Sequence, residues 1–447
     1  MTTTATHSHA QLLRVLGLAF GLAAVVGGMV GQGILRTPGI VAGAVHSPEL
    51  IMTLWVAGAL VAGLNALAYV ELGTAIPCAG GPYDFARRAF GSVAGLAVGW
   101  AGWLVLIIAN AYLATVVAEF LHRLGVWPNI GTPIIAVFVL ALFWGVNWTG
   151  TRISGASQVL FSAIKGVVLL GFVVLLFAHP GSAGPAAPVE GAGTTVGIAA
   201  VAAAMRVILS TYNGWQDAVY FCEELQNPER TLPRSMAIGI GGVALLYVLV
   251  NAALLHVLAP AQMASSTLPA ADAARVVLGG NGEFALTVFG VLSVAAITNL
   301  MTMKSARLSF ALARQQLLPA KLTHVATSGT PRPALTTSVL LSAAFAATGT
   351  YETLVATSVA LTVSMFIIVN AAAIRLRRKE PELQRPFRMP LFPIPAVLAI
   401  GVNSALLAAL IYDDPLHSLE GFALVAVIAL LYSILGQSRK RAAAAAA

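Results

Sequence analysis

The sequence predicts an all-α polytopic membrane protein with about twelve transmembrane helices. Of its 447 residues, 58% are hydrophobic and 9% are charged. A soluble domain carries about 25% charged residues, so this composition is typical of a membrane protein. Apolar runs long enough to cross a bilayer recur between charged or Pro- and Gly-rich breaks. The basic residues behind the net charge of +8 flank these runs, so membrane topology explains them without a nucleic-acid partner.

The predicted spans follow one another along the whole chain. The first group lies at residues 15–45, 48–76, 93–121, 133–148, 153–179 and 197–225. The second group lies at residues 236–258, 284–313, 334–347, 353–376, 391–411 and 416–435. The first apolar stretch runs about 30 residues, too long for the core of a signal peptide, so we expect a retained helix.

Charge asymmetry orients these spans. One set of connections holds most of the basic residues, at Arg14, Arg87, Arg88, Arg152, Arg230, Arg234, Lys321, Arg332, Arg375, Arg377, Arg378, Lys379, Arg385, Arg388, Arg439, Lys440 and Arg441. The alternate set is mostly acidic, at Glu49, Glu190, Asp272, Glu283, Glu352, Asp413 and Asp414, with Arg123 and Arg275 as exceptions. Basic loops stay in the cytoplasm, which predicts a cell inner-membrane protein with both termini cytoplasmic.

Two predicted spans are interrupted by glycines and polar residues. Residues 27–34 read GGMVGQGI, and residues 211–216 read TYNGWQ. The first break lies about 17 residues in from the cytoplasmic side and the second about 16 residues in from outside, each roughly 25 Å along its helix. Two discontinuous helices that meet near the middle of the membrane indicate an inverted-repeat transporter. Close packing of small residues between helices is the alternative for either stretch taken alone.

Broken helices expose peptide groups that can bind a ligand. The N-terminal end of a half-helix favours a carboxylate, and the C-terminal end favours an ammonium group. A zwitterion such as an amino acid suits both ends. Lys165 adds a buried charge about 18 Å into its span, where an ionisable side chain is costly and functional by default. Snorkelling of Lys165 to the interface is the alternative.

Four segments resemble one known superfamily. They are residues 69–91 (YVELGTAIPCAGGPYDFARRAFG), 212–235 (YNGWQDAVYFCEELQNPERTLPRS), 305–319 (SARLSFALARQQLLP) and 377–395 (RRKEPELQRPFRMPLFPIP). They are similar, in order, to segments of the amino acid–polyamine–organocation superfamily, and the branch they most resemble is the L-type amino acid transporter group. The resemblance implies a single transporter domain over 1–447, with a five-plus-five inverted repeat at 13–179 and 196–377. Two further helices at 391–436 and discontinuous helices 1 and 6 complete the expected fold.

The resemblance also implies a substrate site. Backbone amides of Gly31, Gln32 and Gly33 are expected to hold the carboxylate, with Met29 and Ile34 beside them. Carbonyls of Ser210, Thr211 and Asn213 are expected to hold the ammonium group, and Gly214 permits the unwinding. Tyr212, Trp215 and Gln216 are expected near the substrate side chain. Many relatives carry a gating aromatic where Ser210 stands, so the residue that forms the outer gate is left open.

Other polar residues receive roles from the resemblance or from their positions in the spans. Lys165 matches a lysine near helix 1, where its ammonium would replace the cation that sodium-coupled relatives bind, and its burial also permits proton coupling. Asn110 and Asn299 are predicted either to contact substrate or to form interhelical hydrogen bonds. Glu71, Glu223, Glu224 and Arg307 are predicted inner-gate ion pairs, with a solvated surface role as the alternative.

The predicted function is sodium-independent transport of amino acids across the membrane by alternating access, through exchange or proton coupling. A polyamine or cationic amino acid antiporter of the same fold ranks second, because Asp217 is the only carboxylate near the breaks. An intramembrane enzyme would need buried catalytic groups, and a channel would need a filter, and neither is visible. We expect no cofactor and no metal. The partners are an amino acid, protons and lipid, with monomer and homodimer both open.

Overall fold

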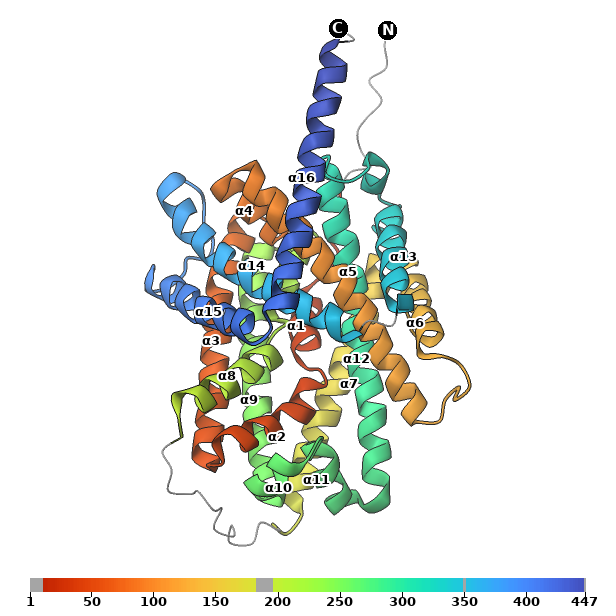
Figure 1. The fold of residues 1–447 in the computed structure, drawn as a ribbon, viewed down its shortest axis with the longest axis vertical. Helices are drawn as coiled ribbons and strands as arrows, with labels where there is room; N and C mark the ends of the chain where they lie inside the picture. The colour runs from red at the N-terminus through yellow and green to blue at the C-terminus, as the bar shows by residue number, and fades with distance from the viewer. Residues whose placement is uncertain (1–10, 182–195, 349–350, 446–447) are drawn as a thin grey trace.

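The computed structural model describes residues 11–181, 196–348 and 351–445, and the side chains within these ranges except those of 351–357 and 431–445. Glu190 and the termini themselves, which the predicted topology uses, lie outside the described residues. The chain is a helical bundle in which α16 projects beyond the rest at one end and α10 and α11 lie at the other (Figure 1). Within the described residues the only β-type pairing is an isolated bridge between Leu16 and Leu225.

The elements follow the predicted order closely. They are α1 Leu18–Met29, α2 Gly33–Val45, α3 Pro48–Ala75, α4 Pro82–Phe90, α5 Ser92–Arg123, α6 Thr132–Trp148, α7 Thr151–Ala178, α8 Ile198–Thr211, η1 Trp215–Phe221, α9 Pro228–Val257, α10 Pro260–Ser265, α11 Pro269–Leu278, η2 Gly279–Asn281, α12 Gly282–Arg314, η3 Ala320–Thr323, α13 Arg332–Thr348, α14 Tyr351–Lys379, α15 Ile394–Asp413 and α16 Pro415–Ala445.

The prediction of an all-α polytopic membrane protein is confirmed. Among the described residues, 8 helical segments are long and apolar enough to cross a membrane, and the bent pair α1 and α2 makes 9. The remaining predicted spans coincide with α8, α13 and α16, which fall outside that set. The count of about twelve spans therefore stays a prediction.

The first predicted break is confirmed. After Met29 the chain becomes extended at Val30, and α2 continues from Gly33 at an angle of 43° to α1. Glycine destabilises a helix interior. The four glycines within residues 27–33 therefore lower the free-energy cost of interrupting the helix here.

The sixth predicted span is α-helical only as far as Thr211. A turn follows, Gly214 adopts φ +116°, and the chain continues as the 3-10 helix η1. Next, α9 begins at Pro228, within the connection predicted up to residue 235. Proline is favoured in the first turn of a helix, and a helix can extend past the bilayer where its side chains are charged, as Arg230 and Arg234 are here.

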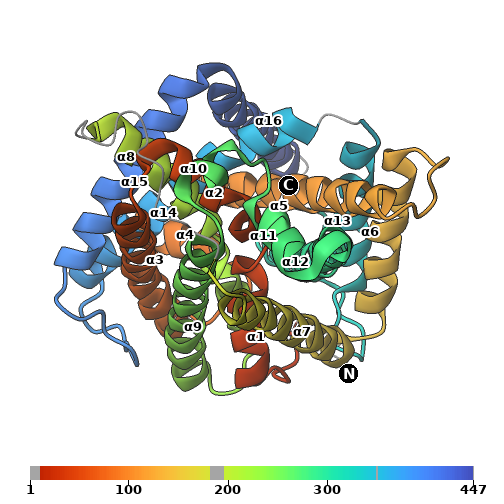
Figure 2. The ribbon, with the colours of Figure 1, turned by 90° about the horizontal axis from the view of Figure 1, so that it is seen from below.

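The two largest hydrophobic clusters both include residues of α12. One cluster joins α1, α3, η1 and α9 to it, and the other joins α5, α6 and α13 to it. The second view shows α3 and α9 on one side and α6 and α13 on the other (Figure 2). Three helix pairs pack directly, namely α3 with α9, α5 with α12, and α6 with α13. The boundaries of the two repeats, at 13–179 and 196–377, stay a prediction.

Candidate substrate-binding site

The two helix breaks meet at a pair of glycines. A Cβ built on Gly214 would lie 2.3 Å from the Gly28 carbonyl oxygen, and one built on Gly28 would lie 2.6 Å from the Gly214 carbonyl oxygen. No side chain fits at either position without moving the other backbone. The glycines therefore bring the interrupted ends of α1 and α8 into direct contact.

A lysine caps the first break. Lys165 on α7 is fully buried, and its ammonium donates to the carbonyl oxygens of Gly27 at 2.6 Å and Val30 at 2.7 Å. Ser293 on α12 also donates to the Val30 carbonyl, at 3.1 Å. These carbonyls belong to the negative end of α1, which a cation stabilises. Lys165 thus lies buried against helix 1 rather than at a surface, and its role in coupling stays a prediction.

The other side of the same break presents backbone donors. Because α2 begins at Gly33, the N–H groups of Gly33 and Ile34 have no partner within the helix, whereas that of Leu35 donates to the Gln32 carbonyl at 3.1 Å. Gly31 and Gln32 precede them in the turn. Such an N-terminus carries a partial positive charge and is a ready anion site.

Side-chain hydrogen bonds hold the second break open. Asn213 accepts through Oδ1 from the Gly214 amide at 2.9 Å and from the Gln216 side chain at 2.9 Å. Tyr247 on α9 ties the two breaks together, because its hydroxyl donates to the carbonyls of Met29 at 2.7 Å and Thr211 at 3.4 Å. The peptide groups released by both interruptions are thus kept in fixed positions.

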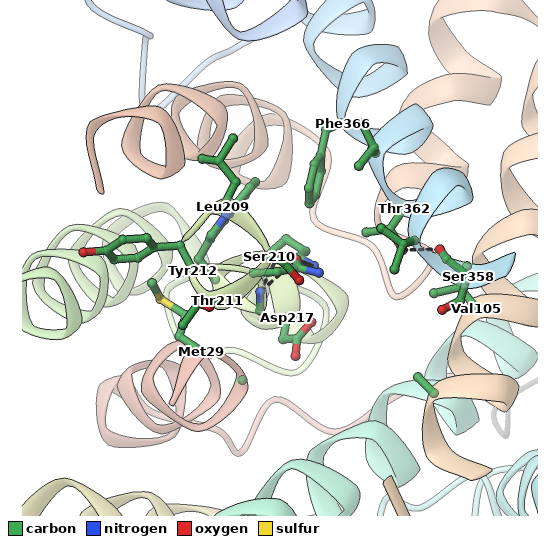
Figure 3. Close-up of a pocket in the computed structure, with 18 of the residues that line it drawn as sticks. Met29, Val105, Leu209, Ser210, Thr211, Tyr212, Asp217, Ser358, Thr362 and Phe366 are labelled. Atoms are coloured by element: carbon green, nitrogen blue, oxygen red, sulfur yellow. Dashed lines mark hydrogen bonds between the residues drawn. The ribbon is translucent and has the colours of Figure 1, made fainter. Parts of the chain in front are cut away.

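A cavity of about 540 Å³ lies beside the breaks, within the usual range for a small-molecule site. Its wall comes from α1, α2, α3, α4, α5, α8, η1, α12, α14 and α15. Met29, Thr211 and Asp217 lie on the side formed by the breaks, whereas Thr362 and Phe366 of α14 lie across from them (Figure 3). Trp215 stacks on Phe366 at 5.3 Å between ring centroids, which closes one face of the cavity with aromatic surface.

Most residues predicted to bind substrate line this cavity. They are Met29, Gly31, Gln32, Gly33, Ser210, Thr211, Tyr212, Asn213, Gly214, Trp215 and Gln216. Ile34, Asn110 and Asn299 do not line it. Asn299 donates to Gln158 at 2.9 Å, and Asn110 accepts from Thr302 at 3.1 Å, so both join helices in this conformation. In this conformation both asparagines form interhelical hydrogen bonds, the second of the two predicted roles. Their contact with substrate stays a prediction.

The cavity wall contains a buried ion pair that was not predicted from the sequence. Lys304 on α12 pairs with Asp217 on η1, and their side chains are 4% and 0% exposed. Both lie in the cavity wall. The depth argument that singled out Lys165 applies equally to Lys304, which stands inside the apolar segment 284–313.

The predicted gate residues all form ion pairs. Arg307 donates to both carboxylate oxygens of Glu224, at 2.8 and 3.0 Å, with side chains 1% and 0% exposed. Arg377 donates to Glu71 at 2.8 Å. A solvated surface role does not fit Glu71 or Glu224, because both are at most 1% exposed.

A third pair lies toward the end of α12. Glu223 accepts from Arg314 at 2.8 and 2.9 Å. The residues after η1 thus carry Glu223 and Glu224 against α12, on the side of the molecule that holds the basic connections.

A polytopic helical protein with a cavity between two discontinuous helices is, by class, a secondary transporter. The sequence model of the family "Amino acid permease" matches residues 12–434, so the chain belongs to that family. The resemblance to the superfamily of amino acid, polyamine and organocation transporters is confirmed, and the chain is a transporter rather than an enzyme.

Individual relatives cover most of the chain. The "Serine/threonine exchanger SteT" of Bacillus subtilis (strain 168) is 25% identical over 440 residues, covering 96% of this chain and 98% of that protein. The "b(0,+)-type amino acid transporter 1" of Mus musculus is 28% identical over 417 residues, covering 91% and 84%. The "Large neutral amino acids transporter small subunit 2" of Mus musculus is 28% identical over 400 residues, covering 86% and 74%.

Proposed function

We propose that this transporter exchanges neutral amino acids across the cell inner membrane by alternating access, without sodium. The observation that carries the proposal is the ammonium group of Lys165 on the Gly27 and Val30 carbonyls. A cation bound at the end of a broken helix stabilises the interruption. Here a side chain of the protein supplies that charge, so no dissolved cation is needed.

The two sides of the breaks suit a zwitterion. The amides of Gly31, Gln32 and Gly33 match a carboxylate, and the acceptors around Thr211 and Asn213 match an ammonium group. Aromatic and apolar residues such as Trp215 and Phe366 form much of the remaining wall. This division favours an amino acid whose side chain carries no charge.

A cationic cargo is less well supported. Asp217 is the one carboxylate residue among the described residues of the cavity wall, and Lys304 already neutralises it. A polyamine carries positive charge along its whole length and needs several acceptors that have no other cation beside them. The alternative of a polyamine or cationic amino acid antiporter therefore ranks second.

The ion pairs support alternating access. Glu224 with Arg307 and Glu223 with Arg314 both join the segment after η1 to α12, and Glu71 with Arg377 joins α3 to α14. Together they close the side with the basic connections, which the charge rule assigns to the cytoplasm. The direct packing of α3 with α9, α5 with α12 and α6 with α13 is what two five-helix repeats at 13–179 and 196–377 would produce.

Exchange is favoured over proton-coupled uptake because one relative is named a serine/threonine exchanger. The test is uptake of radiolabelled L-serine, L-alanine and L-leucine into proteoliposomes, with L-arginine and putrescine as competitors. We expect uptake only when a neutral amino acid is present inside, with no dependence on sodium. Uptake driven by a pH gradient alone would overturn exchange in favour of proton symport, and stronger competition by putrescine would favour the second candidate.

A further inference from the structure

The cavity wall contains a buried carboxylate with one unused acceptor. Asp217 is 0% exposed, and its Oδ1 pairs with Lys304. Its Oδ2 has no hydrogen-bond partner in the part of the chain that the structure describes. An unpaired buried carboxylate oxygen is costly, and such a group in a folded protein indicates a role such as ligand binding.

This oxygen faces the break in the first helix. A Cβ built on Gly28 would lie 2.7 Å from Asp217 Oδ2, so the carboxylate packs directly against the α1 backbone. Gly28 and Asp217 both contribute to the cavity wall. Asp217 lies on the same side of the cavity as Met29 and Thr211 (Figure 3).

Several backbone acceptors around the breaks already accept a hydrogen bond within the protein. Carbonyl oxygens that accept a hydrogen bond from another protein group are those of Gly27, Met29, Val30, Ser210 and Thr211. An ammonium group that binds beside these carbonyls shares them with a protein donor, whereas the second carboxylate oxygen of Asp217 has no partner among the described residues. The free oxygen offers the stronger contact, because a carboxylate that pairs with Lys304 through Oδ1 still accepts a charge-assisted hydrogen bond at Oδ2.

We propose that Asp217 Oδ2 accepts a hydrogen bond from the ammonium group of the substrate, and that Lys304 is the positioning residue that holds the carboxylate in place. The inference rests on the proposed function, because it assumes an amino acid in this cavity. The contact requires a protonated amine next to the carboxylate that binds at Gly31 and Gln32. It selects amino acids over 2-hydroxy acids of the same shape, which offer a neutral hydroxyl at that position.

The experiment compares those two classes of compound. Uptake into proteoliposomes is measured with the radiolabelled L-alanine, L-serine or L-leucine that the wild-type protein transports best. It is inhibited with the same unlabelled amino acid or with the matching 2-hydroxy acid, which is L-lactate, L-glycerate or L-2-hydroxyisocaproate. The Asp217→Asn variant should lose about tenfold or more of the preference for the amino acid, while inhibition by the hydroxy acid stays within about twofold.

A matched control separates this effect from a general one. Asp272→Asn makes the same chemical change on α11, outside the cavity wall, and should keep the wild-type preference. Equal weakening of both inhibitors in Asp217→Asn, or an unchanged preference, would overturn the inference. If wild-type protein transports none of the three amino acids, the proposed function fails together with the inference. If it transports one of them, the Asp217 variants test only the role of Asp217.

A second variant keeps the test decisive if the single change unfolds the protein. Asn in place of Asp217 leaves Lys304 buried and unpaired, which is strongly destabilising. The double variant Asp217→Asn with Lys304→Gln removes both charges, and it should show the same loss of preference. Lys304→Arg keeps a cation beside Asp217 and should restore much of the preference that Lys304→Gln loses. An equal preference in both Lys304 variants would contradict the positioning role.

Discussion

Gly28 and Gly214 contact each other through their backbones at the point where the two broken helices cross, with 2.3 Å between the Gly28 oxygen and a Cβ built on Gly214. This contact places the negative end of α1 and the interrupted end of α8 side by side. Lys165, Tyr247 and the Asp217–Lys304 pair are all arranged around it. The cavity wall depends on two positions that have no side chain.

The glycine at the second break is expected to be irreplaceable. Gly214→Ala combines a positive φ of +116° with a steric clash, so it should destabilise the fold by about 1–3 kcal/mol and abolish uptake. Gly166→Ala on α7, where a Cβ would meet nothing within 4 Å, is the matched control and should transport normally. Thermal stability in detergent and uptake into liposomes measure both effects. Normal transport by Gly214→Ala would show that the breaks do not need to touch.

The buried lysine at the first break is expected to be essential. Lys165→Ala removes both hydrogen bonds to α1 and the charge that its negative end faces, so uptake should fall by about tenfold or more. Lys321→Ala, on the exposed surface of η3, provides a control that keeps full activity. Full coupled transport by Lys165→Ala would refute the role of this residue.

The inner ion pair is expected to control access from the cytoplasm. Glu224→Gln leaves the Arg307 charge buried without its carboxylate, which should destabilise the closed arrangement by about 3–5 kcal/mol. The variant should therefore favour opening of this side. Cys222 reports the opening, because it is 0% exposed and lies two residues before Glu224. In a Cys78→Ser background, a maleimide should label Cys222 faster in Glu224→Gln than in the parent. Equal labelling rates would remove this pair from the gate.

A polar cluster is expected to anchor α15 to the bundle. Asn65 accepts through Oδ1 from Asn370 at 3.1 Å and from Asn403 at 2.7 Å, which joins α3, α14 and α15. Asn65→Ala removes one acceptor from each of two buried amide groups. It should lower the free energy of unfolding by about 1 kcal/mol, near the energies measured for hydrogen bonds between membrane helices. A fall in the midpoint of thermal unfolding measures this cost. An unchanged midpoint would mean that apolar packing alone holds α15.

Several features of the site could be predicted from residue types alone. The glycines at 27, 28, 31 and 33 predict a break because glycine has a low helix propensity. The backbone groups that such a break leaves unsatisfied must face a cavity. Lys165 stands out because a charge in an apolar run has few acceptable environments. The same signal existed for Lys304. What it did not reveal was the partner, because Asp217 is distant in sequence and only the packing of η1 on α12 joins them.

Other assignments depended on rotation about the helix axis. Asn110 and Asn299 sit at the right depth for substrate, yet they point to neighbouring helices, Asn299 toward Gln158 and Asn110 toward Thr302. Apolar residues occur on all sides of a buried membrane helix, so its sequence carries little information on which face meets a cavity.

The sequence by itself determined the class of protein, the order of the helices and the two places where helices stop. These follow from local quantities, namely the length of apolar runs, the charge of the connections and the low helix propensity of glycine. Only the tertiary structure decided which charges pair and which polar groups line the cavity. Those choices depend on how distant helices pack, and a charge in a low-dielectric interior is stabilised by its neighbours in space rather than by its neighbours in sequence.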